Sequence, residues 1–497
     1  MIHPFAFESL SKITDHPAIR KVNGGLGRVG RLVLGLVIFT VGCAKHQQHL
    51  ELARTDFYAG DLESAQLRLE QASEASKRHG DVLQLDQAMV RLWSGEPRQA
   101  ERLLVEIRDR FDELEDTISA KNAVALATDD TRREYEGEDY EKVLIRAMLA
   151  LCNLMDDGED VMAYAFQVNE KQAEIIQSLS REPREAVRLE SADGNSQQGE
   201  LSSGSNTDQK GNGVETVDPR SYYSQLALGP YLYGVVREST LLNYDDAARG
   251  YARVVDWAPE FTQGRLDLER ARHGVHSAPG HGVVYLFAMV GRGPHKEESV
   301  EIPTSQAMFV ADRILSAIGE HSVTPTVAPI KVPVVVQPRN PLDCLAVQVA
   351  EGNWLRTETV SNLGDMAVQQ GLARRSEIVG RAVARRSLKK AALYATKQAA
   401  ETQGAAELAL DLVGIAWEAS ESADIRGWEF LPETIQVLRL ELPQGRQELV
   451  LQPALGSTRV GLPERIQVDV VEGRNSFVMV NYPGPHRVGR VLQSMPH

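Results

Sequence analysis

Two nine-residue stretches of this chain match each other at an offset of 35 residues: ARTDFYAGD at positions 53–61 and AMVRLWSGE at positions 88–96. A glycine stands near the end of each stretch, at Gly60 and Gly95. Glycine adopts positive φ in a tight turn without the steric cost of a Cβ atom. The pattern therefore predicts pairs of helices that are joined by glycine turns.

The repeated unit resembles the tetratricopeptide repeat, a helix–turn–helix unit with a period of about 34 residues. Ala65 and Ala100 correspond to each other at the same offset. The resemblance implies that these alanines are the small residues at which two helices cross.

Weaker units follow along the chain. Residues 136–140 and 157–160 carry turn residues between two helical runs, and residues 231–259 are similar to one more repeat. We therefore predict tetratricopeptide-like helical repeats over residues 43–180 and a further repeat over residues 221–273.

Residues 181–220 interrupt the helical pattern. They are rich in Ser, Gly, Asn, Gln, Asp and Glu. Such a segment cannot bury enough apolar area to offset the entropy that ordering it would cost. We predict a disordered, low-complexity insertion in the helical array.

The periodicity changes at residue 282. Residues 283–290 read as a strand, residues 291–294 as a turn, and residues 298–302 as a strand that returns beside the first. Pro333 favours an edge position for the strand at 332–336. Further strands are predicted at 345–349, 435–440, 447–451, 466–470 and 476–480, and helical runs at 362–400 (one helix or two) and 405–419.

The strands on either side of these helices are too few to stand alone. We expect the first strands (274–361) and the C-terminal strands (426–497) to form one β domain around a helical insertion (362–425). The predicted fold class is α+β: an N-terminal α-helical tetratricopeptide-like array, followed by an antiparallel β-sandwich with inserted helices.

The N-terminal region has the parts of an export signal. Arg28 and Arg31 precede an apolar run at 32–41, which ends at Gly42-Cys43. This arrangement resembles the lipobox of bacterial lipoproteins, although Thr40 stands where that family prefers leucine. The resemblance implies that residues 1–42 are a signal peptide with an N-terminal extension, and that Cys43 carries lipid.

Two other interpretations of the apolar run are an uncleaved anchor and a buried segment. The run is much shorter than the roughly 20 residues that span a bilayer. We expect the protein to be lipid-anchored in the cell envelope. Ala44 after the cysteine resembles an outer-membrane sorting signal, which implies an outer-membrane protein facing the periplasm if the bacterium is diderm.

Several stretches of the mature chain are similar to an uncharacterised family of bacterial lipoproteins. They are residues 282–285, 293–298, 428–432 and 435–445. The family joins tetratricopeptide-like repeats to a C-terminal β domain. The resemblance implies architecture and envelope location, and it brings no catalytic residues.

Composition excludes some partners. The formal net charge of -15 opposes binding of nucleic acid over the whole surface. The spelling G-x-G-x-x-G at residues 25–30 lacks the preceding strand and the following helix that a dinucleotide site requires. Cys152 and Cys344 are far apart in sequence, and we expect free buried thiols rather than a disulfide.

The remaining candidates for chemistry are weak. His273, His276 and His281, with His295 farther on, could ligate zinc, but a solvated linker is the favoured interpretation. The acidic residues at 156–160 match no calcium loop, and no G-x-S-x-G motif occurs. We predict no enzymatic activity, no catalytic residues, no cofactor and no metal.

Basic residues concentrate in the helical run at 371–400. Arg374, Arg381, Arg385 and Lys389 fall near one face at helical spacing. This candidate docking strip suits an anionic lipid, a glycan polymer or an acidic partner. The favoured alternative is a solvated face that complements the protein's own acidic repeats.

These features together predict a lipid-anchored scaffold of the cell envelope, whose helical array offers a groove to a protein partner. The alternative is an envelope hydrolase or glycan-binding lipoprotein that uses the β domain. A deep pocket with clustered acidic, histidine and aromatic side chains would favour the alternative. A continuous groove without such a cluster would favour the scaffold.

Overall fold

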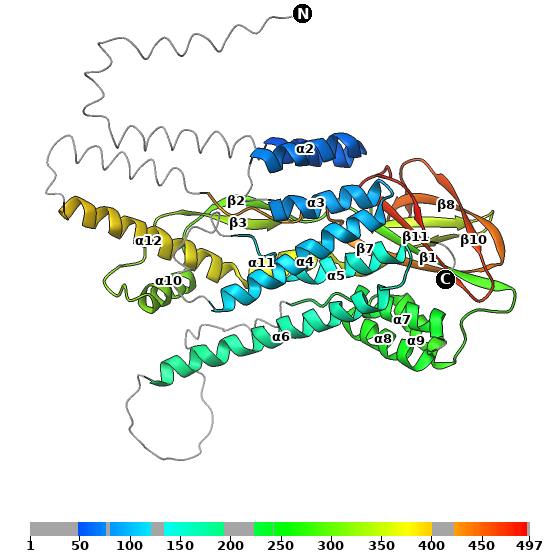
Figure 1. Ribbon diagram of the computed structural model, residues 1–497, viewed down its shortest axis with the longest axis horizontal. Coiled ribbons are helices and arrows are strands. Elements are labelled where there is room, and N and C mark those ends of the chain that lie inside the picture. Colours follow the sequence, from blue (N-terminus) through cyan, green and yellow to red (C-terminus); the bar gives the residue numbers. More distant parts are fainter. Residues whose placement is uncertain are drawn as a thin grey trace, which may run out of the picture.

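The structure, a computed structural model, describes residues 48–75, 80–120, 134–192, 223–241, 243–399 and 422–494. It is a mixed α+β fold in which helices come first and the strands follow from residue 281 onward (Figure 1). No helix within these ranges is both long enough and apolar enough to cross a membrane.

The N-terminal part consists of helices in antiparallel succession. A helix over residues 48–59 is followed by α2 (Leu62–Ala75), α3 (Gly80–Trp93), α4 (Pro97–Ala120), α5 (Asp139–Leu154), α6 (Val161–Ala192), α7 (Leu228–Leu241), α8 (Tyr244–Trp257) and α9 (Thr262–Arg272). Gly60 and Gly95 turn the chain with φ of 86° and 88°. Ala65 and Ala100 are fully buried. The predicted glycine turns are confirmed, and the crossing of helices at Ala65 and Ala100 stays a prediction.

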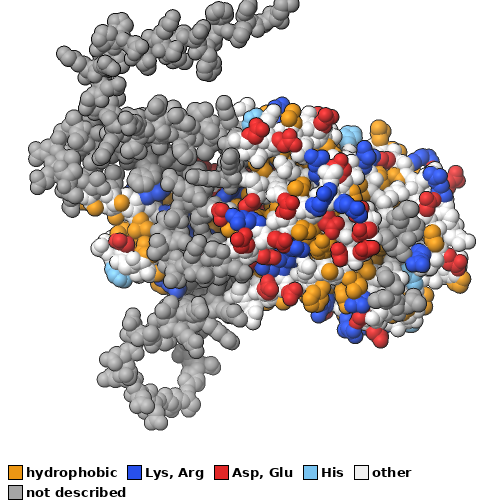
Figure 2. All heavy atoms as spheres, viewed as in Figure 1, with side chains coloured by type: hydrophobic (Ala, Val, Ile, Leu, Met, Phe, Trp, Pro, Cys, Tyr) orange, Lys and Arg blue, Asp and Glu red, His pale blue; other side chains and the backbone are white. Residues whose placement is uncertain are grey.

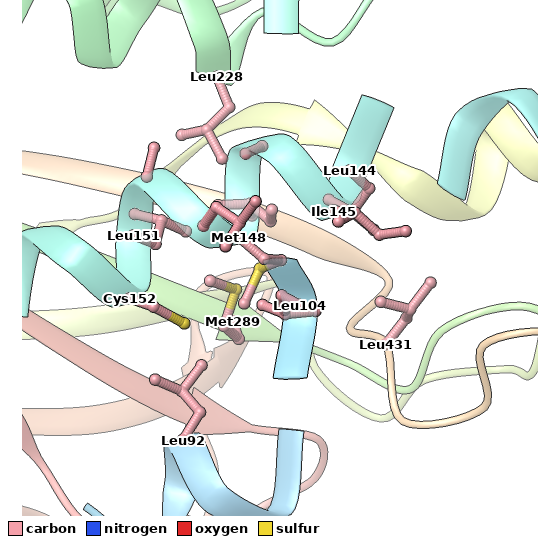
Figure 3. Close-up of a cluster of buried hydrophobic side chains, with 14 of the residues drawn as sticks. Leu92, Leu104, Leu144, Ile145, Met148, Leu151, Cys152, Leu228, Met289 and Leu431 are labelled. Carbon is pink, nitrogen blue, oxygen red and sulfur yellow. The ribbon is translucent and has the colours of Figure 1, made fainter. Parts of the chain in front are cut away.

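Helix α5 lies at the centre of this part. Every residue of α5 after Asp139 is buried. Figure 3 shows Met148 and Leu151 of α5 among side chains from three other helices and a strand: Leu92 of α3, Leu104 of α4, Leu228 of α7 and Met289. The helices therefore share their core with the strands and do not close on themselves.

The first sheet has the strand order β12-β11-β1-β7-β6. Its members are β12 (Leu492–Gln493), β11 (Asn475–Tyr482), β1 (His281–Val290), β7 (Thr434–Pro443) and β6 (Glu358–Asn362). β1 pairs in parallel with β11 and antiparallel with β7. The prediction of purely antiparallel strands is wrong for the β1–β11 pair. Both strands are buried on both faces, which is typical of parallel pairing.

The second sheet is antiparallel, with the order β10-β8-β4-β5. It comprises β10 (Glu464–Val470), β8 (Gly445–Leu455), β4 (Cys344–Val349) and β5 (Trp354–Arg356), and β9 (Thr458–Arg459) pairs with β8. Strands from both sides of the inserted helices enter both sheets, as predicted.

The first sheet lies between the second sheet and the helices. Along β1, Val284 and Leu286 share an apolar cluster with the second sheet. The alternate residues Tyr285 and Phe287 belong to the core of the helices. Because both faces of β1 are covered, its sequence is continuously apolar rather than alternating.

A separate lobe projects at the left of Figure 1. It contains β2 (His295–Glu301), β3 (Ile330–Val336), α10 (Ser305–Ala317) and α12 (Arg375–Ala399), and α11 (Leu363–Ala373) joins it to the sheets. The lobe has its own apolar core. β2 pairs with β3 and not with β1, so the predicted return of residues 298–302 onto the first strand is wrong. No pattern in the sequence predicted α10. β3 has an edge position, as Pro333 indicated.

Other boundaries differ from the predictions. Helix α6 continues to Ala192, so residues 181–192 are helical and not part of a disordered insertion. The rest of the predicted insertion (193–220) and the helical run predicted at 405–419 lie outside the described residues. The run at 362–400 forms two helices. Cys152 and Cys344 are free and buried, as expected.

Candidate functional site

The predicted lipidation residue, Cys43, lies outside the described residues, as does the glycine motif at 25–30. The sites that can be described are the inner face of the helical array, the basic strip, the histidines and a cleft between the sheets.

The inner face of the array, which is the side turned toward the first sheet, holds a segment of the same chain. We call residues 422–433, which lead into β7, the inner segment. Asp86 on α3 accepts the main-chain N–H groups of Glu429 and Phe430, each at 3.0 Å. Glu141 on α5 accepts the main-chain N–H of Trp428 at 2.8 Å. At α3 and α5, the groove predicted for a partner is therefore occupied by the protein's own backbone.

Side chains of the first helix hold the inner segment as well. The ring of Phe57 stacks on Phe430 with 4.3 Å between the ring centroids. The Tyr58 hydroxyl donates to the main-chain oxygen of Glu429 at 3.2 Å, and Arg54 forms an ion pair with the Glu429 carboxylate. Trp428 and Phe430 are almost completely buried.

These contacts place several acidic groups in a region of low polarity. Burial raises the pKa of Asp86, and the nearby charge of Glu429 adds to the effect. Burial also raises the pKa of Glu141. Perturbed carboxyl groups can mark an active site, but here their oxygens accept main-chain N–H groups. We assign Asp86 and Glu141 a structural role.

The pKa of another acidic residue nearby, Glu138, shifts in the opposite direction. Burial alone would raise the pKa of Glu138, but the charges of Lys296 and Arg374 outweigh it and lower the pKa to about 2. Glu138 forms an ion pair with Lys296 on β2. This pair connects the start of α5 to the lobe.

The four residues of the predicted docking strip do not lie on one helix. Arg374 caps the C-terminus of α11, whereas Arg381, Arg385 and Lys389 belong to α12. Arg374 forms an ion pair of 2.6 Å with Asp139 at the start of α5. For Arg374, this contact favours the interpretation that basic residues complement the acidic repeats.

Arg381 pairs with Glu377 of its own helix at 3.5 Å. Arg385 and Lys389 are half-buried and have interaction partners. Whether these three residues bind a partner remains a prediction.

The histidines do not converge. His276 is buried and its Nε2 lies 2.8 Å from Oδ1 of Asn475. His273 contacts the main-chain oxygen of Glu269, and His281 that of Pro279. Within the described ranges, no three histidine, cysteine or acidic side chains are grouped so that they could hold a metal ion.

The acidic turn at 156–160 has a partner within the array. Arg98 at the start of α4 donates to Asp156 at 2.7 Å and to Asp157 at 3.3 Å. These contacts join two successive helix pairs, which agrees with the interpretation of this stretch as a repeat turn.

A cleft of about 720 Å³ lies between the edges of the two sheets. Its lining residues are Gln263, Asp343, Cys344, Trp354, Leu355, Arg356, Thr357, Glu358, Leu438 and Arg439. The lining includes acidic residues and a tryptophan, but no histidine is among these ten.

Sequence reasoning missed Asp86 and Glu141. A signal was present for Asp86, because Val82, Asp86, Met89 and Trp93 share one face of α3 and the other three are apolar. An acid on such a face needs a buried hydrogen-bond donor. The donor comes from residues more than 340 positions later, and the spacing of residues on α3 cannot identify it.

No family model, no curated protein and no solved structure matches this chain.

Proposed function

We propose that this protein is a lipid-anchored scaffold of the bacterial cell envelope, and that it binds a protein partner through the lobe formed by α10, α12, β2 and β3. In this proposal the helices are a tetratricopeptide-like array and the two facing sheets are a β-sandwich. The glycine turns and the apolar cluster between the sheets support these two assignments.

The observation that carries the proposal is the occupation of the inner face by the inner segment. At α3 and α5 this face is not open to a partner, which favours a binding surface elsewhere. The lobe exposes large apolar side chains: Val300, Ile302, Phe309, Val327 and Tyr394. Figure 2 shows hydrophobic side chains on this lobe, at the left of the view. Exposed apolar side chains that gather on one surface are typical of interaction sites.

The position of Cys43 supports anchoring close to the array. The described chain starts at residue 48, already in a helix, and five residues of fully extended chain span at most about 18 Å. A lipid on Cys43 would therefore hold the helices near the membrane surface.

Two variants test the proposal in membranes. Cys43→Ala should abolish acyl labelling and release the protein from membranes; full labelling of this variant would disprove the lipid anchor. For the partner, a photo-crosslinker in the lobe should yield a defined adduct that Phe309→Ser weakens at least tenfold. The control Leu462→Ser removes a side chain outside the lobe that is even more exposed than Phe309. An equal loss of the adduct with both variants, or no loss with either variant, would argue against the lobe as the partner surface.

A further inference from the structure

The cleft between the two sheets lies where the chain leaves one sheet and enters the other. β5 belongs to the second sheet and pairs only with β4. Thr357 still donates its main-chain N–H to Leu345 of β4 at 3.0 Å, but from Glu358 onward the chain forms β6 of the first sheet. β6 pairs with β7 only as far as Val437. Within the described residues, the part of β7 after Val437 therefore has a strand on one side only, which is β1.

The main-chain groups of Arg439 and Glu441 point to this open side of β7. Gln444, the residue after β7, donates its N–H to the main-chain oxygen of Gly280 on the β1 side at 2.9 Å. Main-chain groups alternate in direction along a strand, so Leu442 also faces β1, whereas Arg439 and Glu441 face away from it. In the part of the chain that the structure describes, no strand pairs with these two residues on the open side.

The main chain is also accessible at this position. Arg439 as a whole is half-buried, although its side chain is only 8% exposed. Its main chain is therefore more exposed than its side chain. The guanidinium is engaged within the protein, because it donates to the main-chain oxygen of His276 at 2.6 Å and forms ion pairs with Asp267 and Glu441. What Arg439 offers to a ligand is its main-chain N–H and C=O.

A comparable edge elsewhere in the molecule is protected. β10 is the outermost strand of the second sheet. On its outer side, the Gln493 side-chain amide donates to the main-chain oxygen of Gln467 at 3.1 Å, and the Ser476 hydroxyl donates to that of Asp469 at 2.7 Å. Proteins protect such edges because unpaired strands pair with other chains. Among the described residues, no side chain caps the edge of β7 in this way, and that edge borders a cleft of about 720 Å³.

The walls of the cleft suit an extended peptide. Trp354, Leu355 and Leu438 give it apolar surface, and Leu355 is 42% exposed. Alternate side chains of a strand point to the same face. Every second residue of a strand beside β7 would therefore meet this apolar wall.

We propose that the open edge of β7 binds an extended segment of a different protein, which adds to the first sheet as one more strand. The segment occupies the line that β6 leaves at Val437 and bonds to the main chain of Arg439 and Glu441. In strand addition, main-chain hydrogen bonds give affinity and contacts of alternate side chains give specificity. The edge from Leu438 to Pro443 spans about 20 Å at roughly 3.3 Å per residue. This site is independent of the partner surface proposed for the lobe.

The test uses the full-length protein in detergent and a library of fluorescent hexapeptides in which apolar and polar residues alternate. Both ends of each peptide are capped, so that no terminal charge contributes, and binding is measured by fluorescence polarisation. We expect saturable binding of at least one peptide. Two analogues of that peptide then carry N-methyl groups on its odd or on its even residues. The analogue whose methyl groups face β7 should bind at least tenfold more weakly than the other, because it cannot donate to the open edge.

A pair of variants locates the binding at β7. Glu441→Pro removes an N–H of the open edge and no hydrogen bond to β1, and proline is tolerated at such edge positions. Glu441→Thr is the matched control, because it removes the same carboxylate and keeps the N–H. Both variants lose the acceptor of the Ala278 N–H, so they share that effect on stability. We expect Glu441→Pro to bind the peptide at least tenfold more weakly than Glu441→Thr.

Three results would overturn the proposal. The first is the absence of saturable binding by every peptide at millimolar concentration. The second is equal affinity of the two methylated analogues for the wild-type protein, a comparison that does not depend on the folding of any variant, or equal affinity of the two Glu441 variants. The third is a concentration-dependent dimer in sedimentation that Glu441→Pro abolishes, which would show that a second copy of this chain occupies the edge.

Discussion

The carboxylate of Glu141 accepts the main-chain N–H of Trp428 at 2.8 Å, although the two residues are 287 positions apart in the chain. The same carboxylate accepts the hydroxyl of Tyr135 at 2.5 Å and the main-chain N–H of Glu138 at 2.9 Å. Glu141 therefore joins the beginning of α5 to the inner segment. This relationship makes the helices and the sheets interdependent.

We predict that Glu141→Leu destabilises the protein by about 1–3 kcal/mol, because it leaves the buried N–H of Trp428 without an acceptor. Glu170→Leu is the control, since Glu170 is an exposed glutamate on α6. Denaturant titration should show a lower midpoint for the first variant and little change for the second. Equal midpoints would mean that water or another group satisfies the Trp428 N–H.

The contribution of Glu138 should depend on pH. Its pKa is lowered from the ordinary 4.5 to about 2, so the folded state binds the proton more weakly than the unfolded state. The stabilisation is therefore complete above pH 4.5 and is lost as the pH falls toward about 2. Glu138→Gln should cost roughly 3 kcal/mol at pH 7, and the difference from wild type should shrink at acidic pH. A difference that is the same at pH 7 and pH 3 would exclude the ion pair with Lys296 as its source.

Local patterns in the sequence identified most elements. The glycine turns at Gly60 and Gly95 and the strands at 345–349 and 466–470 follow from short-range rules of turn chemistry and alternation. The pairing of β2 with β3 could not be predicted, because α10 separates them and no local signal identifies the partner strand. The parallel pairing of β1 and β11 could not be predicted for the same reason, because the two strands are nearly 200 residues apart in the sequence.

The candidate sites, too, could be predicted from the sequence only in part. Composition correctly suggested that Cys152 and Cys344 are free thiols. The basic pattern of 371–400 was visible, but the break between α11 and α12 and the contact of Arg374 with Asp139 depend on tertiary packing. The cleft brings Arg356 and Arg439 together from different sheets, and no spacing in the sequence connects them.

We predict that Ala100→Trp destabilises the array. Ala100 is fully buried near the start of α4, and forcing a larger side chain into such a site costs about 1–3 kcal/mol or more. Ala173→Trp is the control, because Ala173 is exposed on α6. Thermal unfolding should distinguish the two variants by several degrees. If both variants unfold at the same temperature, the helices do not cross at Ala100.

The last prediction concerns separation of the two halves. The sequence predicted one β domain over residues 274–497, but the first sheet buries one entire face, including Tyr285, Phe287 and Phe477, against the helices. A fragment of residues 275–497 would expose this apolar face, and we expect it to aggregate or to bind hydrophobic dyes.

The same question can be tested in the folded protein. A protease site introduced after Gly274 should be cut readily, because residues 272–275 are exposed. The two pieces should remain associated through their common core and unfold in a single transition. Their separation into soluble species, with a cooperative transition for residues 275–497, would show that the sheets fold independently. In that case the contacts of Asp86 and Glu141 with the inner segment would be a docking interface between two domains, and the inner face of the array would become available to a partner.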